Sequence, residues 1–409
     1  MKKFCYLFLI VCAALHAERA KKPFVETKLV GHLAAIKSQM QSMKKIMEQA
    51  APATLPVAIG TLPYTIREPG IYYFPNNLVF SGKGPAITVA ANNVVINCYN
   101  NALTVAEGIG ILVSGVREFT LQNGVIQGNV VGMQIENATA VHLLNSFFNG
   151  SKVTIDGASG VTLDTVSCDD SLLTINGSSQ HITLTNCTIN GQITATEVSG
   201  MQISDSLIEG AVTVGANNLQ IQNSAFINGA LLFTNGSGAL LEEVIFDSVE
   251  INQYDSIMAT NCMSRGLHII QGSYCSFIDC HFANAAQANV QLDNATGCLF
   301  SGCKIIDSQA DGIVFTTGSS QNALINCEVS NNGQNGCTIM IGATDNQLLN
   351  NNVYANANYG IYNLEPTTNC LFNVSCNNKG ADCPGSGVHP EQAPGVSSLV
   401  PGSNICCIP

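Results

Sequence analysis

The hexapeptide LTNCTI at residues 184–189 recurs along the chain in related forms, as LQNGVI at 121–126, ISDSLI at 203–208 and LLNNNV at 348–353. Each copy has an apolar residue, a spacer and an Asn-like residue, followed by a small residue, a spacer and a second apolar residue. The Asn-like positions, here called anchors, are Asn97, Asn123, Asn145, Thr165, Asn186, Asp205, Asn223, Glu243, Asn261, Asp279, Gly302, Asn326, Asn350 and Asn373. They lie 18 to 26 residues apart, and a period of this length predicts a solenoid.

The anchors interrupt an alternating pattern of apolar residues. Every residue two positions before an anchor is apolar, from Val95 in the first copy to Leu371 in the last. Apolar residues before the anchor share one side of a strand, and those one and three positions after it share one side of the next strand. The parity changes at the anchor, which predicts a bend there. Asn, Asp and Gly tolerate the left-handed backbone that a one-residue bend requires.

A third short strand precedes each pair, as in GIGILV at 108–113 and KVTIDG at 152–157. Three strands and their turns account for about twenty residues per coil, too few for repeats that alternate a strand with a helix. Helical periodicity is absent between residues 90 and 376. The sequence therefore predicts an all-β, single-stranded parallel β-helix of about 14 coils, with three short strands per coil.

This pattern resembles that of the right-handed parallel β-helix superfamily, which includes the pectin-lyase-like and NosD-like repeat proteins. The resemblance covers roughly residues 60 to 380 and rests on periodicity, so it implies a fold and leaves the activity open. The segment at 61–80 resembles the part that covers the open first coil in such proteins. A cover is expected because an exposed end would pair with the edges of other chains.

The two ends of the chain differ from the repeat region. Residues 1–17 have a basic start, an apolar run and small residues near Ala17, which predicts a secretory signal peptide and export to the periplasm, cell surface or exterior. Within residues 18–50, apolar residues at heptad spacing from 24 to 50 predict an N-terminal amphipathic α-helix. That helix either packs on the β-helix or joins copies of the chain as a coiled coil.

The remaining boundaries follow from composition. Residues 51–60 are expected to be a linker, 61–376 the β-helix and 377–409 a tail rich in Cys, Pro and Gly. No stretch reaches the eighteen apolar residues that indicate a membrane-spanning helix.

Charge is distributed unevenly. The chain has a formal net charge of −12, and nine of its sixteen Lys and Arg residues precede residue 46. The repeat region is therefore acidic, which argues against nucleic acid or anionic lipid as a partner, because both need a dense basic face.

Cysteine follows the repeat. Cys98, Cys187, Cys262, Cys280, Cys303 and Cys327 each come one residue after an anchor, in the slot predicted to face inward. Their stacked Cβ atoms would lie near the strand spacing of about 4.8 Å, beyond disulfide range, so buried free thiols are expected. One or two disulfides are expected among Cys370, Cys376, Cys383, Cys406 and Cys407, without a defined pairing.

Asp169 and Asp170 are the strongest catalytic candidates, with Asp164 nearby and His181 in the next coil. Adjacent aspartates in a β-helix resemble the paired carboxylates of polygalacturonase-like hydrolases, which act as acid and base on a glycosidic bond. The other motifs of that family are absent, and intervals of at most 26 residues leave little chain to wall a cleft. Arg265, His268, Asp279 and Asp293 are a second candidate set, as for a lyase, but they lack calcium-loop spacing. No metal or cofactor is expected.

A threonine row is the most regular outer feature. Thr154, Thr174, Thr194 and Thr213 are expected to stack on successive coils and to form a binding surface that presents hydroxyls to a glycan. Two functions are the main alternatives, and a NosD-like metal-accessory role is a third option without a ligand set to support it. The favoured one is an exported, non-catalytic binding module for a glycan or a host or cell-surface ligand. The alternative is a polysaccharide hydrolase or lyase.

Overall fold

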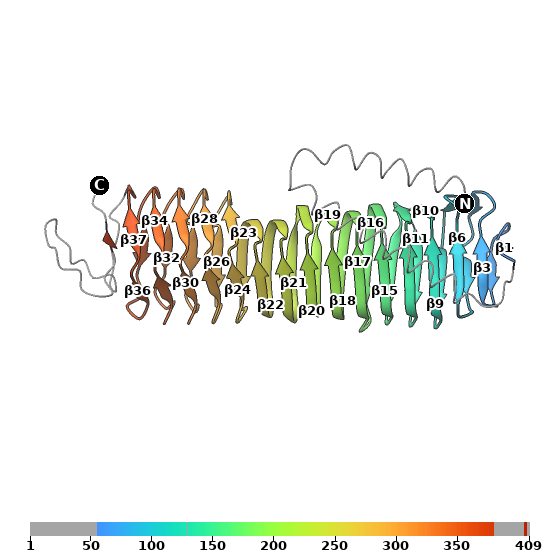
Figure 1. The fold of residues 1–409 in the computed structure, drawn as a ribbon, viewed down its shortest axis with the longest axis horizontal. Coiled ribbons are helices and arrows are strands. Elements are labelled where there is room, and N and C mark those ends of the chain that lie inside the picture. Colours follow the sequence, from blue (N-terminus) through green and yellow to red (C-terminus); the bar gives the residue numbers. More distant parts are fainter. Residues whose placement is uncertain (1–54, 129, 380–404, 407–409) are drawn as a thin grey trace, which may run out of the picture. The chain divides into compact units, whose positions relative to one another are not determined.

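The computed structural model describes residues 55–128 and 130–379, together with the backbone of residues 405–406. These residues form about fifteen stacked coils, and every strand pair in the stack is parallel (Figure 1). Three faces follow one another in each coil. The described residues contain no helix, so the predicted all-β parallel β-helix is confirmed.

The short strands of the three faces are listed in chain order. The first face contains β2 (Tyr64–Ile66), β5 (Pro85–Val89), β8 (Ile109–Ser114), β11 (Val131–Glu136), β14 (Lys152–Asp156), β26 (Val290–Asp293), β29 (Ile313–Phe315), β32 (Cys337–Ile339) and β35 (Ile361–Asn363). The second face contains β1 (Val57–Ala58), β3 (Gly70–Tyr73), β6 (Val94–Asn97), β9 (Arg117–Gln122), β12 (Thr139–Leu144), β15 (Ser159–Asp164), β17 (Gln180–Thr185), β24 (Ser276–Ile278), β27 (Leu299–Ser301), β30 (Ala323–Ile325), β33 (Gln347–Leu349) and β36 (Asn369–Leu371). The third face contains β4 (Leu78–Phe80), β7 (Ala102–Val105), β10 (Val125–Gln127), β13 (Phe147–Asn149), β19 (Leu207–Glu209), β25 (His281–Ala283), β28 (Lys304–Ile306), β31 (Glu328–Ser330), β34 (Asn352–Tyr354), β37 (Val374–Cys376) and β38 (Ile405–Cys406).

Six longer strands in the central coils continue around corners and so contribute to two or three faces. They are β16 (Ser167–Asn176), β18 (Thr188–Ser204), β20 (Val212–Gln222), β21 (Ala225–Glu242), β22 (Ile245–Thr260) and β23 (Met263–Ile270).

Inward side chains of equivalent positions stack along the axis. Leu163, Leu184 and Ile203 lie opposite one another on successive coils of the second face and are buried. The rings of Phe277 and Phe300 stack with centroids 5.0 Å apart. Each such side chain contributes about 1.5–3 kcal/mol through burial, which makes the stacked interior the main source of stability.

The backbone confirms bends at twelve of the fourteen predicted anchors. These residues have φ between 47° and 67°, the left-handed region, and they separate the second face from the third. Even Thr165 and Glu243 adopt this conformation. The packing of the two flanking strands therefore imposes the bend where the residue type does not favour it.

The prediction of a bend at the first anchor is wrong. Asn97 is not in the left-handed region, and the positive φ values fall on Tyr99 and Asn100 instead. The corner of this coil is longer, and Ile96 rather than Val95 faces inward.

The last anchor is also displaced by one residue. The bend is at Phe372, with φ 58°, while Asn373 is buried. Its Oδ1 accepts hydrogen bonds from the backbone and side-chain nitrogens of Asn351 at 2.9 and 2.8 Å. Asn373 thus belongs to an internal amide ladder, which has the same residue type as a bend but the opposite orientation.

The six cysteines of the inward slot are buried free thiols, as expected. Several donate to carbonyls of the preceding coil, as Cys187 does to Leu163 O at 3.4 Å. Burial raises the pKa of Cys98 to about 12, so that thiol stays protonated at neutral pH. In the C-terminal group, Cys376 is disulfide-bonded, whereas Cys370 is buried beside the Asn363 amide.

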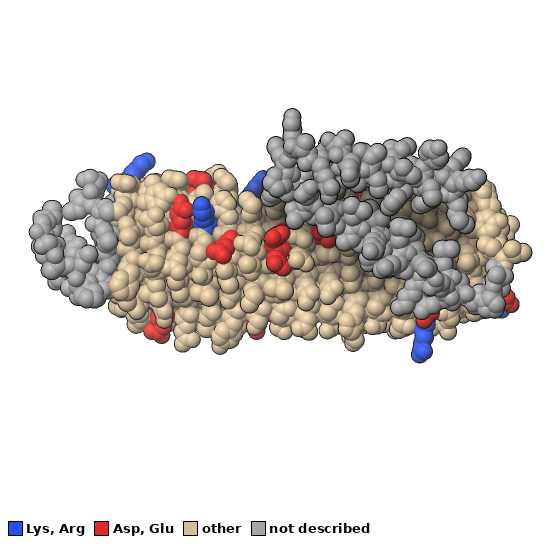
Figure 2. Space-filling view, in the orientation of Figure 1, with Lys and Arg blue, Asp and Glu red and all other residues tan. Residues whose placement is uncertain are grey.

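The predicted signal peptide at 1–17, the helix at 24–50 and most of the tail at 377–409 lie outside the described residues. Of the expected linker at 51–60, the described part contains β1. The segment at 61–80 supplies β2, β3 and β4, which pair in regular register with β5, β6 and β7. This segment therefore forms a coil of the stack. Figure 2 shows scattered Lys, Arg, Asp and Glu side chains among uncharged residues on the visible part of this face.

Candidate functional site

The corner that leads from the third face to the first face of the next coil varies in length. Six residues separate Ala283 from Val290, and six separate Tyr354 from Ile361, in the C-terminal coils. In the central coils the strands β16, β18 and β21 run through this corner without a loop. We call it the return corner. The return corner is therefore shorter in the central coils than in the C-terminal coils.

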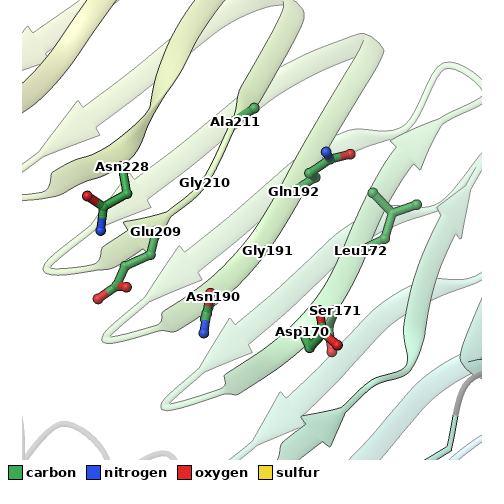
Figure 3. Close-up of a pocket in the computed structure, with 10 residues that line it drawn as sticks. All are labelled: Asp170, Ser171, Leu172, Asn190, Gly191, Gln192, Glu209, Gly210, Ala211 and Asn228. Carbon is green, nitrogen blue, oxygen red and sulfur yellow. The ribbon is translucent and has the colours of Figure 1, made fainter.

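A groove of about 520 Å³ lies along the shortened return corners (Figure 3). Its lining consists of Asp170, Ser171, Leu172, Asn190, Gly191, Gln192, Glu209, Gly210, Ala211 and Asn228. Two glycines allow the backbone to form this sharp corner, because a side chain at either position would collide with the neighbouring coil. A Cβ on Gly191, at φ 153°, would lie 1.9 Å from Ser171 O, and one on Gly210, at φ 134°, would lie 2.1 Å from Gly191 O.

One side of the groove is polar. Asp170, Asn190, Glu209 and Asn228 lie along that side in Figure 3, each from a different coil. Asp169 lies opposite Asn190, which in turn lies opposite Glu209. Asn190 Nδ2 donates to Asp169 Oδ1 at 2.9 Å. We call Asp169, Asp170, Asn190, Glu209 and Asn228 the polar rim.

The threonine row lies next to the groove. Thr154, Thr174, Thr194 and Thr213 occupy opposed positions on four successive strands of the first face, which confirms the predicted stacking. Thr174 is two residues beyond the groove residue Leu172, so both side chains point to the same side of the strand. The same holds for Thr194 beyond Gln192 and for Thr213 beyond Ala211. The Thr row and the groove are therefore one continuous surface.

The structure does not bring His181 to the two aspartates. His181 is exposed at the beginning of the second face, with φ 53°, whereas Asp169 and Asp170 lie at the return corner. Asp164 ends β15 on the second face, where its Oδ1 accepts a hydrogen bond from Asn186 Nδ2 at 3.3 Å. Of the candidate catalytic residues, Asp170 alone lines the groove.

A second polar cluster lies farther along the first face. His268 Nε2 is 2.6 Å from Asp293 Oδ2, and Asp293 also accepts from Gln291 Nε2 at 2.9 Å and from Thr316 Oγ1 at 2.7 Å. Burial raises the pKa of the Asp293 carboxyl, but the hydrogen bonds from Thr316, His268 and Gln291 outweigh it and lower the pKa below its ordinary value.

The Thr row and this cluster are in register. Thr213 lies opposite Leu232, Leu232 opposite Glu250, and Glu250 opposite His268. The two features therefore occupy one outward row, with two coils between Thr213 and His268.

The chain is similar to several solved structures at low sequence identity. Tailspike protein 3 of bacteriophage CBA120 matches with a TM-score of 0.50 and 10% identity, over 73% of this chain and 56% of that chain. The mannuronan C-5 epimerase AlgE4 A-module of Azotobacter vinelandii matches with a TM-score of 0.41 and 11% identity, over 77% and 91%. PfbA, a surface adhesin of Streptococcus pneumoniae, matches with a TM-score of 0.40 and 10% identity, over 75% and 86%. This chain spans just over half the length of the tailspike chain.

The fold is a parallel β-helix, similar to that of the tailspike protein. No protein-family model matches the sequence, and no curated protein matches it significantly. Sequence identities near 10% indicate a shared fold only, and the function of this β-helix depends on the residues of its own surface.

Within residues 55–128 and 130–379, no group of three or more His, Cys, Asp and Glu side chains could hold a metal ion. In the same part of the chain, no helix has the length and apolar character needed to cross a membrane.

Sequence reasoning missed Asn190, Glu209 and the two glycines of the groove. A signal for two of them is present, because Asp169, Asn190 and Glu209 each come four residues after an anchor. That position is polar in six consecutive copies, from Asn101 to Glu209, so the pattern includes these rim residues without delimiting the rim. No comparable signal identifies the groove itself, because its depth depends on the corners of neighbouring coils.

Proposed function

We propose that this chain is an exported, non-catalytic β-helix protein that binds glycans through the groove and the Thr row. The observation that carries the proposal is the adjacency of these two features. Hydroxyl and amide side chains both donate and accept hydrogen bonds, as sugar hydroxyls do, and the rim carboxylates accept from them. Gly191 and Gly210 let a ligand approach the backbone closely.

A glycan-binding screen on the full chain tests this proposal. Binding should be weakened by Glu209→Gln and by Thr194→Val, which remove a charge and a hydroxyl with little change in shape. Asp307→Asn is a matched control for the acidic positions, because Asp307 is exposed, has φ 59° and follows a third-face strand outside the groove. Binding that is unaffected by both groove variants would contradict the proposal.

Glycoside hydrolysis is the second candidate, because two carboxylates, Asp170 and Glu209, line one groove. Asp169 and Glu209 occupy equivalent positions two coils apart, which corresponds to about 10 Å between their backbones. Inverting glycosidases hold their carboxyl groups about 6.5–9.5 Å apart. Turnover of a polysaccharide that is lost in Asp169→Ala and Asp170→Ala would establish this second function and overturn the non-catalytic one.

Export and self-association are separate parts of the proposal. They rest on residues 1–17 and 24–50 of the sequence. The N-terminal sequence of the protein isolated from its cells tests signal cleavage. Sedimentation of the full chain tests the coiled coil, and a strict monomer would remove it.

A further inference from the structure

The groove carries negative charge only. Among its ten lining residues, Asp170 and Glu209 are ionisable, and Asp169 lies beside them on the rim. Lys152 lies outside the lining, one coil before Leu172. At the other end, Arg265 pairs with Asp247 at 3.5 Å. An anionic sugar in the groove would therefore face like charges without a cation of the lining to offset them.

The groove and the Thr row also share a direction. Each rung comes from the next coil, so hydroxyls along Thr154 to Thr213 and polar groups along Asp169 to Glu209 repeat at the strand spacing of about 4.8 Å. Two parallel rows with the same repeat present a linear pattern of hydrogen-bonding groups. An extended chain of pyranose units advances by a similar step, so its hydroxyls can contact both rows over several coils.

The geometry points to an uncharged linear polysaccharide as the ligand, with its chain parallel to the β-helix axis between the polar rim and the Thr row. This inference rests on the proposed glycan-binding function and narrows it to one class of glycan. Neutral hydroxyls donate to the Asp170 and Glu209 carboxylates and exchange hydrogen bonds with the Thr hydroxyls and Asn amides. Polyuronates are disfavoured by repulsion from the rim.

Calorimetric titration of the full chain with linear oligosaccharides of matched length tests the inference. The probes are uncharged N-acetylchito-, cello- and manno-oligosaccharides, anionic oligogalacturonate and oligomannuronate, and cationic deacetylated chito-oligosaccharide. We expect an uncharged probe to bind and the polyuronates to bind at least about tenfold more weakly. Affinity should rise with chain length over the first several sugars, since each added unit reaches a further coil.

Two variants locate the effect. Asp170→Asn combined with Glu209→Gln should narrow the difference between uncharged and anionic probes, because it removes the charge and keeps the hydrogen-bonding groups. Thr194→Val should weaken binding of the uncharged probe, whereas Thr183→Val, on the second face of the preceding coil, should not.

The outcomes distinguish a wrong class of glycan from a wrong proposed function. Tighter binding of a polyuronate, or of the cationic probe, than of every uncharged one would overturn this inference and leave glycan binding in place. If Thr194→Val and the double variant both bind the uncharged probe as tightly as the unchanged chain does, the ligand binds elsewhere. That result would also overturn the inference. Binding of no probe of any class would contradict the proposed function itself.

Discussion

Asn190 donates a hydrogen bond from Nδ2 to Oδ1 of Asp169 at 2.9 Å, across two adjacent coils at the rim of the groove. Glu209 occupies the equivalent position on the next coil. The amide therefore separates two carboxylates that would otherwise be consecutive in one row. This arrangement gives the rim polar groups of both donor and acceptor type.

Replacing this amide by a carboxylate should destabilise the rim. Asn190→Asp would place three carboxylates in consecutive positions, and like charges opposite each other destabilise adjacent strands by roughly 0.2–1 kcal/mol. The loss in free energy of unfolding should shrink at high salt, since the site is exposed. Urea unfolding at low and high NaCl measures it. The control is Gln192→Glu on the opposite side of the groove, where the opposed residues Leu172 and Ala211 are uncharged. A destabilisation by Asn190→Asp no larger than that by Gln192→Glu would contradict the prediction.

Gly191→Ala should lower the free energy of unfolding more than Asn190→Asp does. Its Cβ would meet the Ser171 carbonyl oxygen at 1.9 Å at a φ of 153°, so the corner has to move. Backbone strain of this kind costs of order 1–3 kcal/mol. The comparison is Gly84→Ala, at the return corner of the first coil, where an added Cβ meets nothing within 4 Å. Equal unfolding midpoints for the two variants would contradict the prediction, because they would show that the backbone at this corner can shift at little cost.

The Asp293 cluster should make stability depend on pH. The folded-state pKa of this carboxyl is lowered, so the stabilisation is present above the ordinary pKa of Asp, near 3.9, and is lost as the pH falls through the lower folded value. In thermal unfolding between about pH 5 and pH 2, Asp293→Asn should lose less stability than the unchanged chain. Asp307→Asn serves as the comparison. Parallel curves for the unchanged chain and Asp293→Asn would refute the assignment.

Tyr254 should be a stability determinant inside the stack. Its buried hydroxyl donates to Ala216 O at 2.6 Å, at an irregularity between β20 and β21. Tyr254→Phe removes a buried hydrogen bond, and an unsatisfied buried group costs about 1–3 kcal/mol. Tyr274→Phe, on a side chain that is 68% exposed, should have little effect. The free energy of unfolding from urea titration distinguishes them, and similar values would argue against the role of this bond.

Sequence pattern predicts the repeating part of this molecule well. The bend at Asn186, the inward position of Leu184 and the buried thiol of Cys187 all follow from one six-residue copy, because each coil has to bury the same side of the same short strands. The pattern fails at its two ends. An Asn in a bend and an Asn in the buried ladder look alike in sequence, so the pattern predicts a bend at Asn373, whereas the bend lies at Phe372.

The sequence by itself determined the period, the left-handed bends, the inward rows and the stacking of the Thr row, because these depend on residues within one coil and on their repetition. Only the tertiary structure decided where the groove lies, which carboxylates line it, and that His268 meets Asp293. Those relationships join residues about twenty positions apart, and they depend on how many residues each return corner contains. A change of a few residues in one corner raises or lowers its surface relative to the next coil while leaving the repeat unchanged.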